Sequence, residues 1–294
     1  MPDALTAPHG PPGRILLVGC GKLGTRLGQD LTAVGWDVFA LRRDTASLPA
    51  GFSALAVDLR EPIRDALPDV DALVITLPPG TQDPGGQPDG YRASLHHLAA
   101  ALPSVPRRVV FVSSTRVFEG YTDGRVLTEA EAPAPVTARG RALLDGELLA
   151  SDLFGAHIVR PAGIYGPGRT MLVRNVIEGA PVQYARRTNR IHETDLVRTL
   201  EALLVAADPP RLLHAVDQGP VPLGEVVTYI ARQLGLPAPP RARPEVASGT
   251  ILSGARLLGL LGALSYPTFE TGYAHLIATR PDGAVSRPQD GFDR

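Results

Sequence analysis

The fold of this chain is decided by residues 15–24, which read ILLVGCGKLG. The apolar run 15–18 is typical of a buried parallel strand, and the pattern G-x-G-x-x-G leads from it into a helical pattern over 23–34. The three glycines permit a tight turn, close approach to a pyrophosphate and close packing of helix on strand. The helix N-terminus attracts the anion. We therefore predict a dinucleotide site formed by Gly19, Cys20, Gly21, Lys22, Leu23 and Gly24.

Lys22 and Cys20 each have a second interpretation. Lys22 either faces a bound pyrophosphate, which offsets the unfavourable position of a cation at a helix start, or is simply solvated. We interpret Cys20 as a small residue of the turn.

The second strand, 38–41, indicates which dinucleotide binds. It ends in Leu41-Arg42-Arg43, where an NAD-binding chain carries an acid for the ribose 2′-hydroxyl, roughly twenty residues after the glycines. Guanidinium groups pair well with a 2′-phosphate. We predict NADP as cofactor, with NAD less favoured. A solvated basic pair beside Asp44 is the alternative.

Short apolar runs alternate with helical patterns along the first part of the chain. This order predicts an α/β fold, a Rossmann-type doubly wound parallel sheet. The predicted strands are 15–18, 38–41, 54–57, 72–77, 109–113 and 158–160, and the predicted helices are 23–34, 91–102 and 138–153.

The rhythm changes after residue 160, where short helices and loops replace the alternation and 221–234 is the best amphipathic helix. We expect a small C-terminal, mostly helical substrate lobe over the carboxyl edge of the sheet, where ligands bind in such folds. The predicted dinucleotide-binding domain comprises 13–165 and 190–216, the lobe comprises 166–189 and 217–280, and 1–12 and 281–294 are predicted flexible ends.

Composition excludes several function classes. The 294 residues are 44% hydrophobic and 20% charged with a net charge of -1, which argues against a nucleic-acid partner. One cysteine excludes an internal disulfide and argues against a Cys-based zinc site, and we expect no bound metal. Without a signal segment or a membrane-length apolar run, we expect a cytoplasmic protein with no membrane partner, a monomer or homodimer acting on a small-molecule substrate.

Further motifs follow the glycine-rich turn in a recognisable order: 57–59 read VDL, 112–115 read VSST, 160–168 read RPAGIYGPG and 191–196 read IHETDL. With them the chain resembles the extended and atypical short-chain dehydrogenase/reductases, the NAD-dependent epimerase/dehydratase family, over roughly residues 14–278. The turn is one residue shorter than is usual in the extended branch, which is typical of atypical members.

The resemblance implies a seven-stranded Rossmann domain with a small substrate lobe. It also implies where the cofactor lies. Asp58 and Leu59 lie near its adenine. Leu77, Pro78, Pro79 and Ser113 lie along its length, and the loop 161–164 faces its nicotinamide.

Family chemistry uses a Tyr, a Lys four residues later and a Ser or Thr hydroxyl. Ser114 matches the hydroxyl. The Tyr-x-x-x-Lys pair belongs in the helix that begins at 135–141, which reads PVTARGR, and Lys22 is the only lysine of the chain. The resemblance therefore implies a non-standard active site that lacks this dyad.

Replacement groups are harder to identify. Arg141 or Arg139 supplies charge, but arginine stays protonated and is a poor proton relay. Tyr165 and His192 are candidate donors, although both also suit structural roles. We retain Ser114, Tyr165 and Arg141 as catalytic candidates, with Arg190 and His192 as substrate-binding candidates.

These observations predict an NAD(P)-dependent oxidoreductase or epimerase-like protein, with an anionic or sugar-nucleotide-like substrate. The alternative is a non-catalytic NADP-binding sensor or regulatory module, so whether the chain is an enzyme stays open at this stage.

Overall fold

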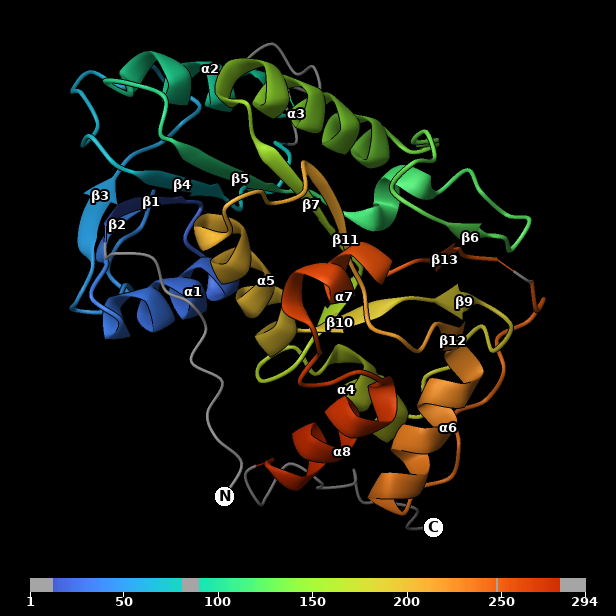
Figure 1. The fold of residues 1–294 in the computed structure, drawn as a ribbon. Coiled ribbons are helices and arrows are strands. Elements are labelled where there is room, and N and C mark those ends of the chain that lie inside the picture. Colours follow the sequence, from blue (N-terminus) through green and yellow to red (C-terminus); the bar gives the residue numbers. More distant parts are fainter. Residues whose placement is uncertain (1–12, 81–89, 247, 281–294) are drawn as a thin grey trace, which may run out of the picture.

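The computed structural model describes residues 13–80, 90–246 and 248–280, so the predicted flexible ends lie outside the described residues. Its centre is a seven-stranded parallel sheet in the order β11-β7-β5-β4-β1-β2-β3 (Figure 1). The strands are β1 (Arg14–Val18), β2 (Asp37–Arg42), β3 (Ser53–Ala56), β4 (Ala72–Ile75), β5 (Arg108–Val112), β7 (His157–Pro161) and β11 (Leu212–Ala215). The predicted fold class is confirmed, and β11 is the one strand of this sheet that the apolar runs did not reveal.

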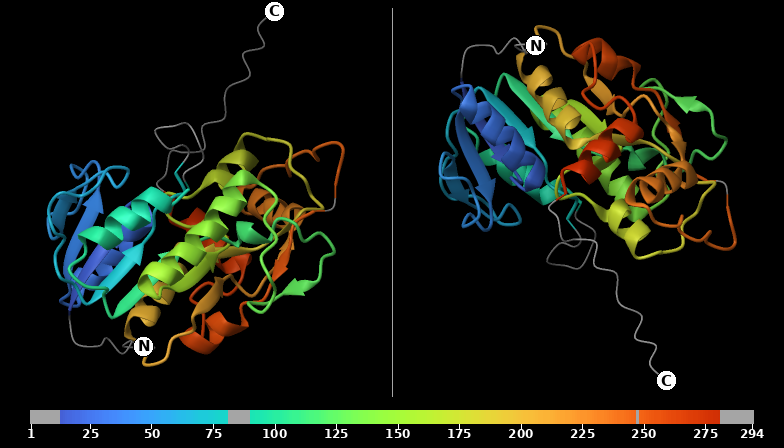
Figure 2. Two further views of the ribbon diagram at one scale, coloured as in Figure 1. Left: turned by 90° about the horizontal axis from the view of Figure 1, so that it is seen from above. Right: turned by 90° about the horizontal axis from the view of Figure 1, so that it is seen from below.

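Both faces of the sheet are covered by helices, which is why its central strands carry apolar runs such as Ile15 to Val18 and Ala72 to Ile75. Within β1, Ile15 and Leu17 join one apolar core while Leu16 and Val18 join the other, as the alternation of side chains along a strand requires. Figures 1 and 2 show the covering helices on opposite sides. They are α2 (Arg92–Ala101) and α3 (Ala138–Phe154) on one face, and α1 (Lys22–Ala33), α5 (Glu193–Val205) and α7 (Ala255–Leu261) on the other.

A smaller lobe lies at the carboxyl edge of the central sheet (Figure 1). Its core packs apolar residues of three helices, α4 (Met171–Ile177), α6 (Leu223–Leu234) and α8 (Phe269–Ala278). Short pairs of strands complete the chain: β8 (Gly163–Tyr165) with β10 (Arg190–His192), β9 (Arg187–Thr188) with β12 (Val221–Pro222), and β6 (Val126–Leu127) with β13 (Ile251–Leu252). The lobe boundaries given above stay a prediction.

Glu201 on α5 gives a test of the packing between α5 and α1. Burial raises the pKa of this carboxyl from 4.5 to about 7, and the charge of Asp30 on α1 adds to the effect. Because the folded-state pKa lies above the unfolded value, the folded chain holds the proton more tightly between these values. The contribution of Glu201 to the free energy of unfolding therefore falls as pH rises through that window, and it stays at its lower value above pH 7.

Glu201→Gln is accordingly expected to raise the free energy of unfolding by about 1–2 kcal/mol at pH 8 and to change it little at pH 4.5. The magnitude follows from 1.36 kcal/mol per pKa unit, discounted because the carboxyl is only partly buried. Urea unfolding at the two pH values measures it. A difference that is the same at both would show that the ionised carboxylate is not destabilising.

Candidate active site

A cleft of about 600 Å³ lies at the carboxyl edge of the sheet. The glycine-rich turn forms one end, and the residues after β5 and the loop after β7 form the other. The start of α3 contributes a further wall. The volume is within the range of ligand pockets, and the position is where open α/β sheets bind ligands.

The glycine-rich turn leaves open space beside the start of α1. Gly19 has φ +79° and its carbonyl oxygen accepts a hydrogen bond from Thr76 Oγ1 at 2.7 Å. Gly21 caps the start of α1 without any side-chain hydrogen bond. A Cβ added at Gly21 would meet only the Gly19 carbonyl oxygen, at 3.9 Å. The first N–H groups of α1 therefore face open space that suits a phosphate.

The predicted turn residues divide into two groups. Gly19, Gly21, Lys22 and Leu23 line the cleft. Cys20 and Gly24 are buried against each other instead: a Cβ on Gly24 would lie 3.4 Å from Cys20 Sγ. Burial also raises the pKa of the Cys20 thiol. Their role is packing under the turn.

Lys22 makes a contact that neither interpretation of the sequence foresaw. Its Nζ donates to the carbonyl oxygen of Gly168 at 2.7 Å, a residue 146 positions away. The hydrogen bond ties the turn to the loop after β8 while the side chain still lines the cleft. No carboxylate among the described residues pairs with the Lys22 charge.

Arg42 lies directly beside the turn, whereas Arg43 is exposed. The Nη1 of Arg42 donates to the Cys20 carbonyl oxygen and to Ser47 Oγ, at 3.2 Å each. Asp58 is engaged by Arg60, whose Nε donates to it at 3.0 Å, and this contact lowers the pKa of Asp58 to about 2. These residues lie outside the cleft lining, as does buried Leu59.

The residues implied along the cofactor do meet at the cleft. Leu77, Pro78 and Pro79 line it, and so do Ser113 and Ser114. Ser113 Oγ donates to Glu147 Oε1 at 2.6 Å, and Glu147 forms a buried ion pair with Arg160. Ser114 Oγ accepts from the backbone N–H of Arg116 at 3.2 Å, so its own hydrogen is available to a ligand.

On α3 the cleft is lined by Arg139 and Leu143, one helical turn apart. This is the spacing of the Tyr-x-x-x-Lys pair, and side chains four residues apart share a helix face. Arg141 does not line the cleft, and its guanidinium donates to the Val136 carbonyl oxygen at 2.9 Å. The start of the helix is fixed by Thr137, whose Oγ1 accepts from the N–H of Gly140.

The remaining candidates are buried away from the cleft. Tyr165 stacks on Tyr273 with ring centroids 4.6 Å apart, and burial raises the pKa of its phenol. His192 caps α5 by accepting from the N–H of Thr194, and burial lowers its pKa to about 4. Arg190 hydrogen-bonds Thr188 Oγ1 and is 4% exposed. We assign none of the three a step at the cleft.

Several lining residues gave no signal in the sequence. Tyr91 is buried, and its hydroxyl donates to the Leu77 carbonyl oxygen at 3.0 Å. Arg116 pairs with Glu119 at 2.6 Å, and Arg169 pairs with Glu193 at 2.8 Å. Both arginines line the cleft. Arg116 stands two positions after Ser114 and pairs with a residue of the same turn. Arg169 pairs with a residue 24 positions away, so no local pattern marks it.

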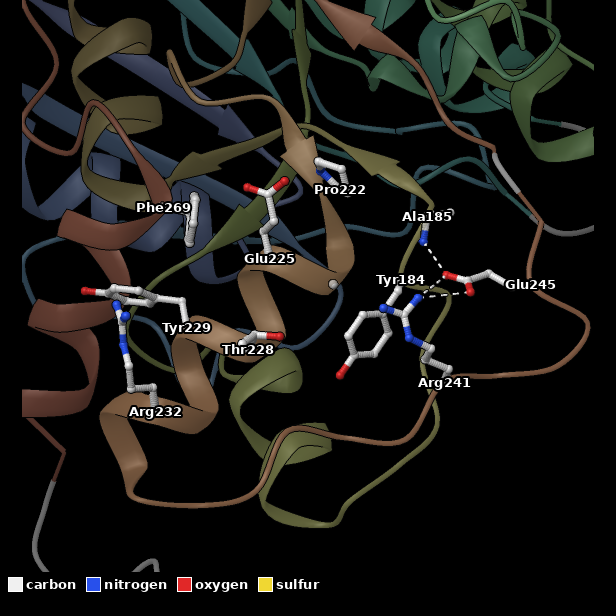
Figure 3. A pocket seen from close by; sticks show the side chains of 11 residues that line it. Tyr184, Ala185, Pro222, Glu225, Thr228, Tyr229, Arg232, Arg241, Glu245 and Phe269 are labelled. Atoms are coloured by element: carbon white, nitrogen blue, oxygen red, sulfur yellow. Dashed lines mark hydrogen bonds and ion pairs between the residues drawn. The ribbon is translucent and has the colours of Figure 1, made fainter.

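A second pocket of about 570 Å³ lies in the small lobe (Figure 3). Two tyrosine rings line it, each with a guanidinium over its face: Arg241 lies 4.4 Å from the ring centroid of Tyr184, and Arg232 lies 5.4 Å from that of Tyr229. Arg241 also pairs with Glu245 at 3.0 Å. The pocket thus offers flat aromatic surface together with charge.

The residues that the structure describes contain no group of three or more histidine, cysteine or acidic side chains placed to hold a metal ion. Within the same residues, none of the helices combines the length and the apolarity needed to cross a membrane.

The chain is similar in sequence to several known proteins. The profile of the RmlD substrate binding domain matches residues 92–188. The chain is 31% identical to Protein YeeZ of Escherichia coli K12 over 264 residues, which is 85% of this chain and 94% of YeeZ. It is 28% identical to the 3-diazoavenalumate denitrifying reductase of a Streptomyces species over 270 residues, 81% of this chain and 87% of that protein.

Solved structures of similar fold include relatives of the same kind. A putative NAD-dependent epimerase/dehydratase from Methylobacillus flagellatus has a TM-score of 0.76 and 31% identity, with 90% of this chain and 98% of that chain covered. MoeE5 in complex with UDP-glucose and NAD has a TM-score of 0.72 and 25% identity, with the same shares covered.

Proposed function

Because this chain belongs to the atypical extended short-chain dehydrogenase/reductases, we propose that it is an NADP-dependent reductase acting on a small anionic substrate in the cleft. One observation carries this proposal above the others. The cleft joins an open helix N-terminus at Gly21 to an available hydroxyl at Ser114, as a bound dinucleotide beside a substrate requires.

The described residues fit the cofactor. The turn from Gly19 to Gly24 would hold the pyrophosphate, because Gly21 leaves the space that a side chain would fill. Arg42 and Arg43 would hold the 2′-phosphate of NADP. The loop from Pro161 to Ile164 would lie against the nicotinamide, which supplies or accepts a hydride when bound.

The substrate oxygen would accept a hydrogen bond from Ser114 Oγ. Arg139 and Leu143 occupy the cleft face of α3, so this face offers charge and apolar surface but no group that exchanges a proton at neutral pH. An epimerase must take a proton from the substrate and later return it, which needs a resident base, whereas hydride transfer to a carbonyl leaves an alkoxide that needs only one proton, which water can supply slowly. We therefore favour reduction, and the Streptomyces relative, a reductase by its name, supports that choice.

A nucleotide sugar is the second candidate substrate. The small-lobe pocket supports it, since aromatic rings and guanidinium groups suit bases and phosphates (Figure 3). The likeness to MoeE5, which was solved with UDP-glucose and NAD, points the same way.

Ser114→Ala is expected to lower kcat/KM for NADPH-dependent reduction by about 10²-fold, because removing one preorganised donor to a reacting oxygen costs 10²–10³ in rate. The dissociation constant of NADPH should change less than about twofold. The measurement is NADPH consumption with a panel of carbonyl carboxylates and nucleotide sugars. We expect slow wild-type rates, since general acid/base help worth about 10²–10⁴ is missing.

The matched control is Ser104→Ala, an exposed serine that hydrogen-bonds Asp69 away from the cleft. It should leave the rate unchanged. Fast turnover that survives Ser114→Ala would contradict the placement of the reacting group. Tight NADPH binding with no turnover of any panel compound would instead favour the non-catalytic sensor.

A further inference from the structure

The charges at the cleft are not balanced. Lys22, Arg116, Arg139 and Arg169 line it, and the part of its lining that the structure describes contains no Asp or Glu. A cleft lined by one sign of charge raises the local concentration of opposite charge.

Two of the four are already neutralised from behind. Glu119 holds Arg116 at 2.6 Å, and Glu193 holds Arg169 at 2.8 Å. Glu119 is itself fixed, because its Oε2 accepts from the hydroxyl of Thr137 at 2.7 Å. These two arginines shape the cleft wall, but they add little net charge to it.

The other two keep their charge, and they lie at different parts of the cleft. Lys22 belongs to the glycine-rich turn and donates only to a neutral carbonyl oxygen. Arg139 lies on α3, and among the described residues it forms no hydrogen bond or ion pair, although its charge acts on nearby Tyr91. A dinucleotide pyrophosphate on the turn would compensate Lys22. It would leave Arg139 without a counter-charge.

Beyond the cofactor, we propose that Arg139 binds an oxyanion of the substrate, a carboxylate or a phosphate. This inference rests on the proposed function. The guanidinium is accompanied on the same helix face by Leu143, and Ile164 also lines the cleft. The substrate class is therefore a small oxyanion with an apolar body, held so that its reacting group meets Ser114. Arg139 acts as a positioning residue.

The test titrates the NADP complex with benzoate, phenyl phosphate and neutral benzamide by calorimetry. The two anions separate carboxylate from phosphate. For the wild type, at least one anion should bind at least about tenfold more tightly than benzamide, since a hydrogen bond to a charged group commonly exceeds the 1.4 kcal/mol that corresponds to tenfold. Arg139→Gln should remove that preference and Arg139→Lys should restore part of it. The affinity for NADP should stay within about twofold in both variants.

Arg174→Gln is the matched control, because Arg174 is an exposed arginine of α4 that pairs with Glu178 outside the cleft lining. It should keep the anion preference. Equal binding of anions and benzamide, no anion binding at all, or a preference that survives Arg139→Gln would overturn the inference while NADP still binds. A loss of NADP affinity in Arg139→Gln would assign the guanidinium to the cofactor and overturn it too. Failure of the wild type to bind NADP would instead defeat the proposed function itself.

Discussion

Gly21→Asp is expected to weaken NADP binding by at least about 100-fold while the free energy of unfolding stays the same or rises. The fold tolerates the side chain, because an added Cβ meets only one carbonyl oxygen at 3.9 Å and the φ of -85° suits any residue. The new carboxylate takes the place proposed for the pyrophosphate and repels it. Losing two charged hydrogen bonds at 1.5–3 kcal/mol each accounts for about 100-fold.

The affinity for NADP should fall while the free energy of unfolding rises or stays the same. Aspartate is a better N-cap than glycine by roughly a few tenths of a kcal/mol, so the carboxylate that removes the ligand slightly stabilises α1. Calorimetric titration and urea unfolding measure the two effects. Gly259→Asp, at an exposed position of α7 with open space around its Cα, should leave NADP affinity unchanged. Wild-type affinity in Gly21→Asp would mean that the turn does not bind the phosphates.

The double variant Arg42→Ala/Arg43→Ala is expected to lose a preference for NADP over NAD that is at least about tenfold in the wild type. Arg42 is already oriented, since two hydrogen bonds hold it beside the turn. Arg43 is exposed and its charge reaches Asp58, but that carboxylate is engaged by Arg60. Both guanidinium groups are therefore available to a 2′-phosphate.

Titrations of both dinucleotides at one fixed salt concentration measure this preference, because salt screens exposed charges. The double variant should bind NADP more weakly and NAD almost as before. Arg26→Ala is the control, an exposed arginine paired with Asp30. Equal wild-type affinities for NADP and NAD, or equal losses in the double variant, would mean that the pair is only a solvated basic surface.

The central sheet could be predicted because its buried strands are recognisable from their apolar residues. Ile15 to Val18 are apolar throughout since helices cover both faces. Strand β11 escaped prediction because it reads LLHA, and its His214 is fully buried although histidine is a polar residue. Burial lowers the pKa of His214 to about 4, so the strand holds a neutral imidazole.

The site was less accessible to sequence reasoning. A glycine-rich turn is a local pattern, so its position could be predicted. Which arginine of α3 faces the cleft depends on the phase of the helix, and the one-turn step from Arg139 to Leu143 was the signal that could have shown it. Tyr165 packs against Tyr273, more than a hundred positions away, and no local pattern reveals such a contact.

The most direct test of the account is a crystal structure of the protein with NADP. We expect the pyrophosphate on the turn from Gly19 to Gly24, the 2′-phosphate at Arg42 and Arg43, and the nicotinamide between Ser114 and Ile164. No lysine should lie near its reacting carbon, and Ser114 Oγ should face a position about 3.5 Å from that carbon. A dinucleotide bound elsewhere, or a tyrosine hydroxyl or lysine amine within hydrogen-bond reach of the reacting atoms, would contradict the account.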